Sequence, residues 1–126
     1  MRTRLTAYIA ETYSVDPETP WAPESDHTVF RHRDNRKWFA LLMTIPRSKL
    51  GLSGEGTVDV INLKCGPVLS ASFRSEPGFF PAWHMNKTHW LTAALDGSAE
   101  EEQIKWLLAI SWDLTAAGKK PPVREN

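Results

Sequence analysis

The sequence predicts an α+β fold in which one antiparallel sheet carries its helices on a single face. Three observations support this prediction. Apolar residues recur at helical spacing near both ends of the chain, runs with strand character lie between them, and tight turns join the first three of these runs. Strands joined by short connections become antiparallel neighbours. The simplest architecture is therefore two-layered, with its elements in the order α-β-β-β-α-β-α.

Length and composition indicate one ordinary globular domain. The chain has 126 residues, of which 41% are hydrophobic and 24% charged, and a chain of this length buries roughly two-thirds of its unfolded surface. We expect a single domain over residues 1–126, with 119–126 as a loose tail. Because the formal net charge is zero, any attraction to nucleic acid or to an anionic membrane must come from local patches.

Cysteine usage and hydropathy bear on the location of the protein. Cys65 is the only cysteine, which excludes an internal disulfide framework and suits a reducing compartment. The chain shows no early apolar run of the signal-peptide kind, and no segment approaches the ~20 apolar residues that a membrane span needs. These features predict a cytoplasmic protein without membrane association.

The first half of the chain predicts a helix and three strands. In chain order we expect a helix over 3–12, an acidic and proline-rich connector over 16–26, strands over 28–33 and 37–45, a loop over 47–56 and a strand over 57–64. Trp21 is expected to pin the connector to the body. The first two strands form a hairpin with its tip at Asp34-Asn35, where Asn35 tolerates a left-handed conformation. The apolar run over 37–45 predicts a central strand covered on both faces, or covered on one and wedged by aromatics on the other.

The second half predicts a short helix, a strand and a long helix. They span residues 67–74, 88–95 and 98–117. Gly66 caps the short helix and Pro67 begins it, since proline suits a first helical turn. Ser98 and Glu101 form a capping box for the long helix. The apolar face of that helix carries Ile104, Leu107, Leu108, Ser111 and Leu114.

No residue pattern supports a metal site or a catalytic centre. The histidines form two pairs, His27/His32 and His84/His89. Each pair is five residues apart, whereas helical ligand pairs need spacings of three or four and strand pairs need even spacings. Cys65 with a histidine of the second pair and Asn86 has the residue types of a thiol triad, but Cys65 ends an apolar strand, where small buried cysteines are common. We therefore predict no enzyme, no catalytic residue, no metal and no cofactor.

Charges segregate along the chain although they cancel overall. Against the single acid Asp34, residues 31–49 hold Arg31, Arg33, Arg36, Lys37, Arg47 and Lys49. Arg31 and Arg33 alternate on one strand and should project from one face beside the hairpin tip. One interpretation is a basic wing that contacts phosphates, with Lys87 and nearby aromatics available to stack on bases. The other is the solvated end of an edge hairpin, which we favour on the residues alone because neutral proteins carry such clusters without binding anything.

Residues 78–91 combine aromatic side chains with two histidines, an amide, a lysine and a proline. A solvent loop would not carry so much apolar area, and a core strand would not carry so many hydrogen-bonding groups. The segment is either a buried polar junction that locks the fold or a recognition surface. We favour the lock, in which His84 and Asn86 satisfy backbone groups at the entry to the next strand.

Several longer motifs are shared with a known family. They are Val29-Phe30-Arg31-His32, Arg36-Lys37-Trp38-Phe39-Ala40-Leu41, Lys49-Leu50-Gly51-Leu52, Asn62-Leu63-Lys64-Cys65 and Phe80-Pro81-Ala82-Trp83-His84-Met85-Asn86-Lys87-Thr88-His89-Trp90-Leu91. Together they resemble the MmcQ/YjbR family from about residue 20 onward. The most specific part is a family signature that we expect to be structural. It consists of Trp83, His84, Met85, Asn86, Lys87, His89 and Trp90.

The resemblance implies a compact α/β domain related in fold to type III secretion chaperones and to frataxin-like proteins. It also implies a small bacterial cytoplasmic protein of a family predicted to bind DNA through a double-wing arrangement. Trp83 and Trp112 stand where the family usually has tyrosine, and Gly66 stands where it usually has aspartate. A role that needs a hydroxyl at Trp83 or a carboxylate at Gly66 is therefore not expected.

These observations lead to two hypotheses about function. The first is a non-enzymatic DNA-binding domain. Its contacts to DNA would be Arg31, Arg33, Arg36, Lys37, Asn86 and Lys87. The alternative is a chaperone-like module that binds a protein or peptide on an aromatic surface. That surface would be formed by Trp21, Phe79, Phe80 and Trp83.

Overall fold

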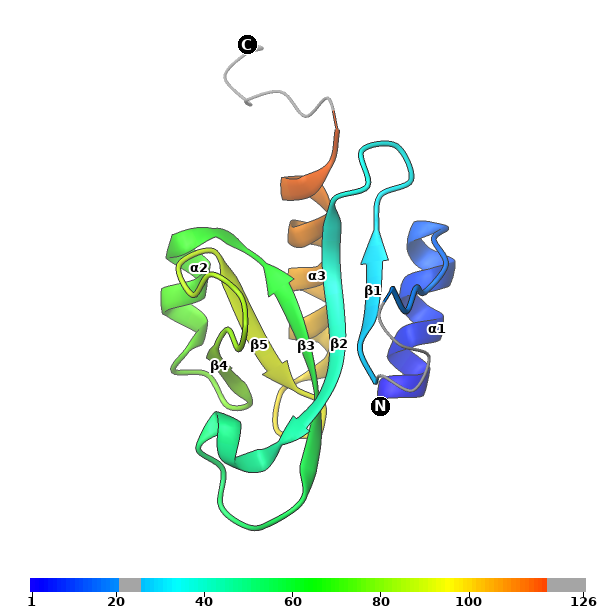
Figure 1. The fold of residues 1–126 in the computed structure, drawn as a ribbon. Coiled ribbons are helices and arrows are strands. Elements are labelled where there is room, and N and C mark those ends of the chain that lie inside the picture. The colour runs from blue at the N-terminus through cyan, green and yellow to red at the C-terminus, as the bar shows by residue number, and fades with distance from the viewer. Residues whose placement is uncertain (21–25, 118–126) are drawn as a thin grey trace.

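A computed structural model describes residues 1–20 and 26–117. Its elements are α1 (Arg2–Tyr13), β1 (Thr28–Arg31), β2 (Trp38–Pro46), the 3-10 helix η1 (Arg47–Leu50), β3 (Thr57–Lys64), α2 (Gly66–Phe73), β4 (Phe79–Pro81), β5 (Trp90–Ala94) and α3 (Glu101–Thr115). The strands form a five-stranded sheet in the order β1-β2-β3-β5-β4, and each neighbouring pair is antiparallel (Figure 1). The predicted α+β class and order of elements are confirmed, and the short edge strand β4 and the turn η1 are additions to it.

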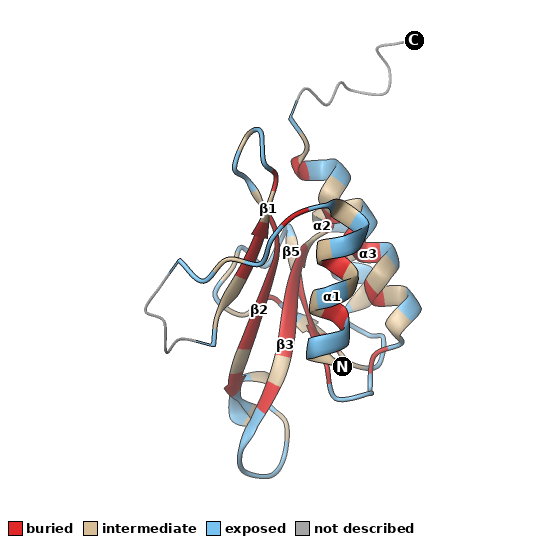
Figure 2. Ribbon diagram, turned by 90° about the vertical axis from the view of Figure 1, so that its right-hand side faces the viewer, coloured by how far each residue is buried: buried red, intermediate tan, exposed pale blue. Residues whose placement is uncertain are grey.

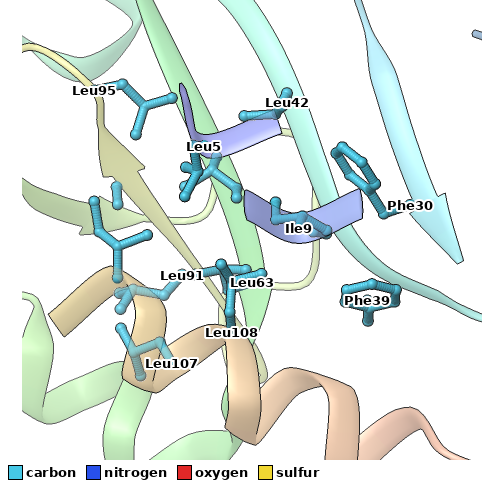
Figure 3. Packing of buried hydrophobic residues seen from close by; sticks show 14 of the residues in the cluster. Leu5, Ile9, Phe30, Phe39, Leu42, Leu63, Leu91, Leu95, Leu107 and Leu108 are labelled. Carbon is cyan, nitrogen blue, oxygen red and sulfur yellow. The ribbon is translucent and has the colours of Figure 1, made fainter. Parts of the chain in front are cut away.

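The three α-helices of the described chain lie on one face of the sheet, as predicted (Figure 2). Leu5 and Ile9 of α1 are four residues apart, so both side chains point into the main core. The buried residues of α3 are Ile104, Leu107, Leu108, Ser111 and Thr115. Figure 3 shows leucines of α1, α3 and the strands converging in this layer. Burying one such side chain stabilises the fold by about 1.5–3 kcal/mol.

A β-bulge places two successive residues of β2, Phe39 and Ala40, on the helix side of the sheet. Phe30 of β1 lies opposite Ala40 of β2. The next residue, Arg31, lies opposite Trp38, so Phe39 is the extra residue of the bulge. Phe39 turns toward the helices, whereas Trp38 packs on the opposite face. Both faces of β2 are therefore covered, as its apolar run indicated.

Ser111 of α3 joins β2 and β3 beside the bulge. Its hydroxyl donates to the carbonyl oxygen of Phe39 at 2.6 Å and accepts from the backbone N–H of Lys64 at 3.0 Å. Ser111 is fully buried, which confirms its predicted inward position. The single buried hydroxyl of Ser111 thus satisfies one backbone acceptor and one backbone donor that would otherwise lack a hydrogen-bond partner.

The second face of the sheet is covered by loops and the short η1 rather than by α-helices. Its buried residues are Val29, Leu41, Met43, Ile45, Val58, Val60 and Ala94. Over them pack Leu50 and Leu52, which belong to η1 and the loop after it, and Phe80, Trp83 and Met85, which belong to the β4–β5 segment. We call this surface the loop face. The front of the signature segment, with Trp83 and Met85, therefore lies on the side of the sheet away from the α-helices.

Two predictions about α3 are wrong. Ser98 does not cap the helix, because its hydroxyl and its backbone N–H both donate to the Asp96 carboxylate, and α3 begins at Glu101 without a side-chain cap. Leu114 is 48% exposed. The inward position at this point belongs to Thr115, because it lies one turn beyond Ser111 on the same helical face.

The hairpin tip also differs from the prediction. Its left-handed residue is Arg36, with φ 64°. Asn35 shapes the turn through its side chain, which accepts from the Lys37 N–H at 2.9 Å and donates to the Thr115 carbonyl at 2.8 Å. The proposed anchor Trp21 and the predicted tail lie outside the described residues. Within those residues, no helix combines the length and the apolar character that crossing a lipid bilayer requires.

Candidate functional site

A buried pair of polar side chains holds the front of the signature segment on the sheet. Asn62 of β3 and Thr92 of β5 lie opposite each other and are both 0% exposed. The Asn62 amide donates to the Trp83 carbonyl at 2.9 Å, and the Trp83 N–H donates to the Thr92 hydroxyl at 3.0 Å. The Thr92 hydroxyl in turn donates to the Asn62 side-chain oxygen. Each member of this lock is thereby hydrogen-bonded, as buried polar groups require.

The rest of the segment forms the turn that leads into β5. The side-chain oxygen of Asn86 accepts from the Thr88 N–H at 2.8 Å, and the backbone carbonyl of Asn86 accepts from the Trp90 N–H at 2.9 Å. The His89 carbonyl accepts from two N–H groups at the start of α2. The expectation that Asn86 satisfies backbone groups is therefore met, and β5 begins at Trp90, two residues later than predicted.

His84 plays a different part from the one predicted. Its side chain is exposed, its backbone is left-handed with φ 65°, and its ring centroid lies 3.7 Å from that of Trp83. A positive φ is unfavourable for a residue with a Cβ, so the surrounding structure has to hold it. The result is a tilted pair of rings on the loop face, with 41° between their planes, where the sequence predicted a hydrogen-bonding histidine.

A pocket opens beside this pair of rings. Its volume is about 330 Å³, and it is lined by Lys49, Leu50, Phe80, Pro81, Ala82, Trp83 and Lys87. The first two residues come from η1 and the others from β4 and the loop that follows it. The described lining combines aromatic and aliphatic surface with two ammonium groups and includes no carboxylate. Such a lining suits an anion that also carries a flat apolar part.

The predicted DNA contacts of the hairpin divide into paired and unpaired cations. The guanidinium of Arg31 contacts the Glu18 carboxylate at 2.6 Å, and that of Arg36 lies 3.6 Å from the same oxygen. The hydrogen bond from Arg31 holds the pKa of Glu18 below its ordinary value. β1 ends at Arg31, so Arg33 lies in the turn beyond it. The two arginines therefore do not project from one strand face, contrary to the prediction.

The remaining cations gather at one end of the sheet. Because neighbouring strands are antiparallel, the start of β2, the end of β3 and the start of β5 all lie at this end. Arg33, Lys37, Lys64 and Lys87 lie at or beyond these strand ends, and we call them the basic end. Within residues 1–20 and 26–117 none of the four forms an ion pair. In Figure 1 the β1–β2 hairpin lies at the end of the sheet away from η1.

Lys64 is the member of the basic end that the sequence analysis missed. It follows Asn62 by two residues on β3, so its side chain leaves the sheet on the loop face opposite Trp90. This alternation was visible in the sequence. What it did not reveal was that the end of β3 lies between the hairpin and the β4–β5 loop, because that depends on the strand order.

The residue types of a thiol triad do not form a reactive site. Cys65 is buried in the main core, and burial raises its pKa to about 11. His84, His89 and Asn86 all have exposed side chains. A thiol in such a setting stays protonated and is a poor nucleophile. Among the residues that the structure describes, no group of three or more His, Cys, Asp and Glu side chains is placed to hold a metal ion.

His32 is a structural group at the base of the hairpin. Its Nε2 lies 2.8 Å from the Thr115 hydroxyl, and its ring centroid lies 4.0 Å from that of Trp112. The Thr115 hydroxyl donates to the Ser111 carbonyl at 2.7 Å, so it accepts from His32. Burial lowers the pKa of His32 below its ordinary value. The hairpin is thus tied to the last turn of α3 by a neutral imidazole.

The aromatic surface of the alternative hypothesis is only partly present. Phe79 is 3% exposed and packs in the main core, so it lines no surface groove, contrary to the prediction. Trp21 lies outside the described residues. Phe80 and Trp83 are half-buried and line the pocket on the loop face.

Comparison with known proteins gives this architecture a family. A family model described as YjbR matches residues 10–114. The chain belongs to the YjbR family. The resemblance inferred from the signature motifs is thereby confirmed.

Three relatives illustrate the extent of this YjbR domain. The uncharacterised protein YyaQ of Bacillus subtilis is 36% identical over 108 residues, which are 86% of this chain and 92% of YyaQ. The crystal structure of a Pseudomonas syringae protein has a TM-score of 0.89 at 45% identity, covering 92% of this chain and 99% of that one. A Deinococcus radiodurans protein with a DUF419 domain has a TM-score of 0.61 at 21% identity, covering 86% of this chain and 73% of that one, which shows a shared fold alone.

Proposed function

We propose that this chain is a non-enzymatic, cytoplasmic DNA-binding domain that contacts duplex phosphates through the basic end. The observation that carries the proposal is that Arg33, Lys37, Lys64 and Lys87 gather at one end of the sheet with no ion pair among the described residues. Ammonium and guanidinium groups that are free of carboxylates are available to replace the counterions of DNA.

The basic end is distinguished by unpaired cations and not by a separation of charge across the molecule. At the opposite end of the sheet, Asp59 pairs with Arg2, and Glu101 pairs with Arg4 and Lys105. Attraction to a polyanion would therefore rest on the local cluster at the basic end, and a zero net charge alone does not prevent it.

The spacing of the basic end also suits a duplex. The β1–β2 hairpin and the β4–β5 loop are separated by three steps in the strand order. At about 4.8 Å a step they lie roughly 14 Å apart. A major groove is about 12 Å wide, so the two connections match phosphates on its two sides. Lys64 at the end of β3 lies between them.

The other predicted contacts take a supporting role in this proposal. Arg31 and Arg36 share the carboxylate of Glu18 and hold the hairpin in place. The Asn86 side chain forms the turn that presents Lys87. Each of these three groups already has a partner inside the protein, so its contribution to phosphate binding is smaller than that of an unpaired cation.

A salt titration of duplex binding by fluorescence anisotropy tests the proposal. We expect micromolar binding, with the logarithm of the association constant falling linearly with log[salt]. The Arg33→Ala/Lys37→Ala variant should reduce the magnitude of this slope by about 2. The Arg4→Ala/Lys105→Ala variant is the matched control, because it removes the same charge at the ion pairs of Glu101 on the helix side. Absent binding, salt-insensitive binding or equal losses in the two variants would refute the proposal.

A second candidate is a chaperone-like module that binds a protein or peptide. The observation in its favour is apolar surface left uncovered: Trp106 of α3 is 52% exposed beside Phe73 of α2, with ring centroids 6.1 Å apart. Polypeptides captured by the wild type should be lost from the Trp106→Ala variant and retained by Leu114→Ala, which removes a similarly exposed apolar side chain. Identical capture by all three proteins would rule this function out.

A further inference from the structure

The pocket on the loop face unites groups from two segments that are distant in sequence. η1 supplies Lys49 and Leu50, and the chain from β4 onward supplies Phe80, Trp83 and Lys87. The two lysines are exposed, and neither forms an ion pair with another described residue. The aromatic side chains are half-buried, so each still offers ring surface to the pocket. Aromatic walls with two free cations are what a flat, anionic molecule requires.

The size of the pocket restricts the molecule further. A volume of about 330 Å³ lies near the lower limit of roughly 300–1,000 Å³ for small-molecule sites. A volume of this order suits one base with its ribose and one phosphate better than two linked nucleotides, which are about twice as large. The absence of a carboxylate from the described lining means that nothing there repels an anion.

The walls of the pocket are held rigidly. The Trp83 backbone is fixed on both sides by the buried Asn62–Thr92 pair. Its indole lies against the tilted ring of His84, with the two ring centroids 3.7 Å apart. Phe80 lies in β4 directly opposite Thr92. A site whose side chains are already in place loses less conformational entropy when it binds.

From these observations we propose that the pocket binds a single nucleotide unit. The base lies against Phe80 and Trp83, and the phosphate lies between the ammonium groups of Lys49 and Lys87. The nucleotide comes either from an unpaired strand or from a free nucleoside monophosphate, since both present the same base and phosphate. In the first case the inference rests on the proposed function, because Lys87 belongs to both the pocket and the basic end.

Three probes separate the parts of the nucleotide: adenosine 5′-monophosphate, adenosine and inorganic phosphate. Binding is measured by calorimetry and by chemical-shift changes of the Trp83 indole N–H. Adenosine 5′-monophosphate should bind saturably and more tightly than either part. The Lys49→Ala variant should weaken it by up to about fivefold, and Phe80→Leu, checked for folding by circular dichroism, by about fivefold or more. Equal binding of adenosine and its monophosphate, equal binding of phosphate alone, or an unchanged Lys49→Ala variant would overturn the proposal.

A second pair of measurements separates this inference from the proposed function. Lys49 lies in η1 and is not one of the four cations of the basic end, so Lys49→Ala should leave duplex affinity within about twofold. Lys37→Ala should weaken duplex binding and leave nucleotide binding unchanged. A tetranucleotide that binds more tightly than the monophosphate, with the same loss in Lys49→Ala, identifies a strand as the source. A tetranucleotide that binds no more tightly identifies the free nucleotide, and loss of both activities in both variants refutes a separate pocket.

Discussion

Replacing Asn62 with alanine tests whether the signature segment is held by a buried polar lock. The substitution leaves the Trp83 carbonyl and the Thr92 hydroxyl without their shared partner. An unpaired buried polar group costs about 1–3 kcal/mol, and both Asn62 and Thr92 are 0% exposed. The Trp83 residue is only half-buried, so water can reach its carbonyl and recover part of the loss. We therefore expect the free energy of unfolding to fall by about 3 kcal/mol.

Urea unfolding followed by far-ultraviolet circular dichroism measures this loss. For an m-value of about 2 kcal/mol/M the midpoint should fall by about 1.5 M while m stays constant. Thr57→Val, an exposed position at the start of β3, is the control and should change stability by no more than about 0.5 kcal/mol. In a double-mutant cycle with Thr92→Val, the losses should fall short of additivity by about 1 kcal/mol, because both changes break one hydrogen bond. An Asn62→Ala loss below about 0.5 kcal/mol, or strictly additive losses, would show that the lock does not hold the segment.

Three further predictions concern stability. Ser111→Ala should lower the free energy of unfolding in urea by about 2 kcal/mol, because the two buried backbone groups that the hydroxyl bridges lose their hydrogen-bond partner. An unchanged free energy of unfolding would contradict that role. Gly78→Ala should lower the free energy of unfolding by about 2–4 kcal/mol, since the φ of Gly78 is +83° and a Cβ would lie 2.4 Å from the Ala99 nitrogen. Gly51→Ala, at φ +72° with open space around it, should lower it by only about 1 kcal/mol. Similar losses in the two variants would refute the close contact. Because burial lowers the pKa of His32, the unfolded chain takes up the proton first, so stability should fall as pH drops below about 6.5 and be independent of this group above that. Thermal unfolding between about pH 7.5 and 5.5 should show a shallower decline for His32→Gln, and an unchanged decline would exclude His32 as its cause.

The sequence by itself predicted the layers of this fold because the relevant signals are local. Helical spacing predicted the first helix, whose Leu5 and Ile9 are buried, and alternation and turn residues predicted the strands, since both signals depend on residues a few positions apart. The signature motifs likewise predicted the family. Local rules failed at Ser98, whose hydroxyl found a nearer partner in Asp96 than the helix end.

The character of the candidate site was decided by tertiary structure alone. Glu18 forms ion pairs with two of the predicted DNA-binding arginines, Arg31 and Arg36. Glu18 is thirteen residues from Arg31 in the chain, so the sequence around neither residue reveals this pair. Strand order brings Lys64 to the end that carries Lys87, and the chain's return over the loop face sets Lys49 beside Trp83. Periodicity tells which side of its own element a residue faces. It does not tell which residues of other elements that side chain contacts, because those contacts depend on how the elements are ordered and packed.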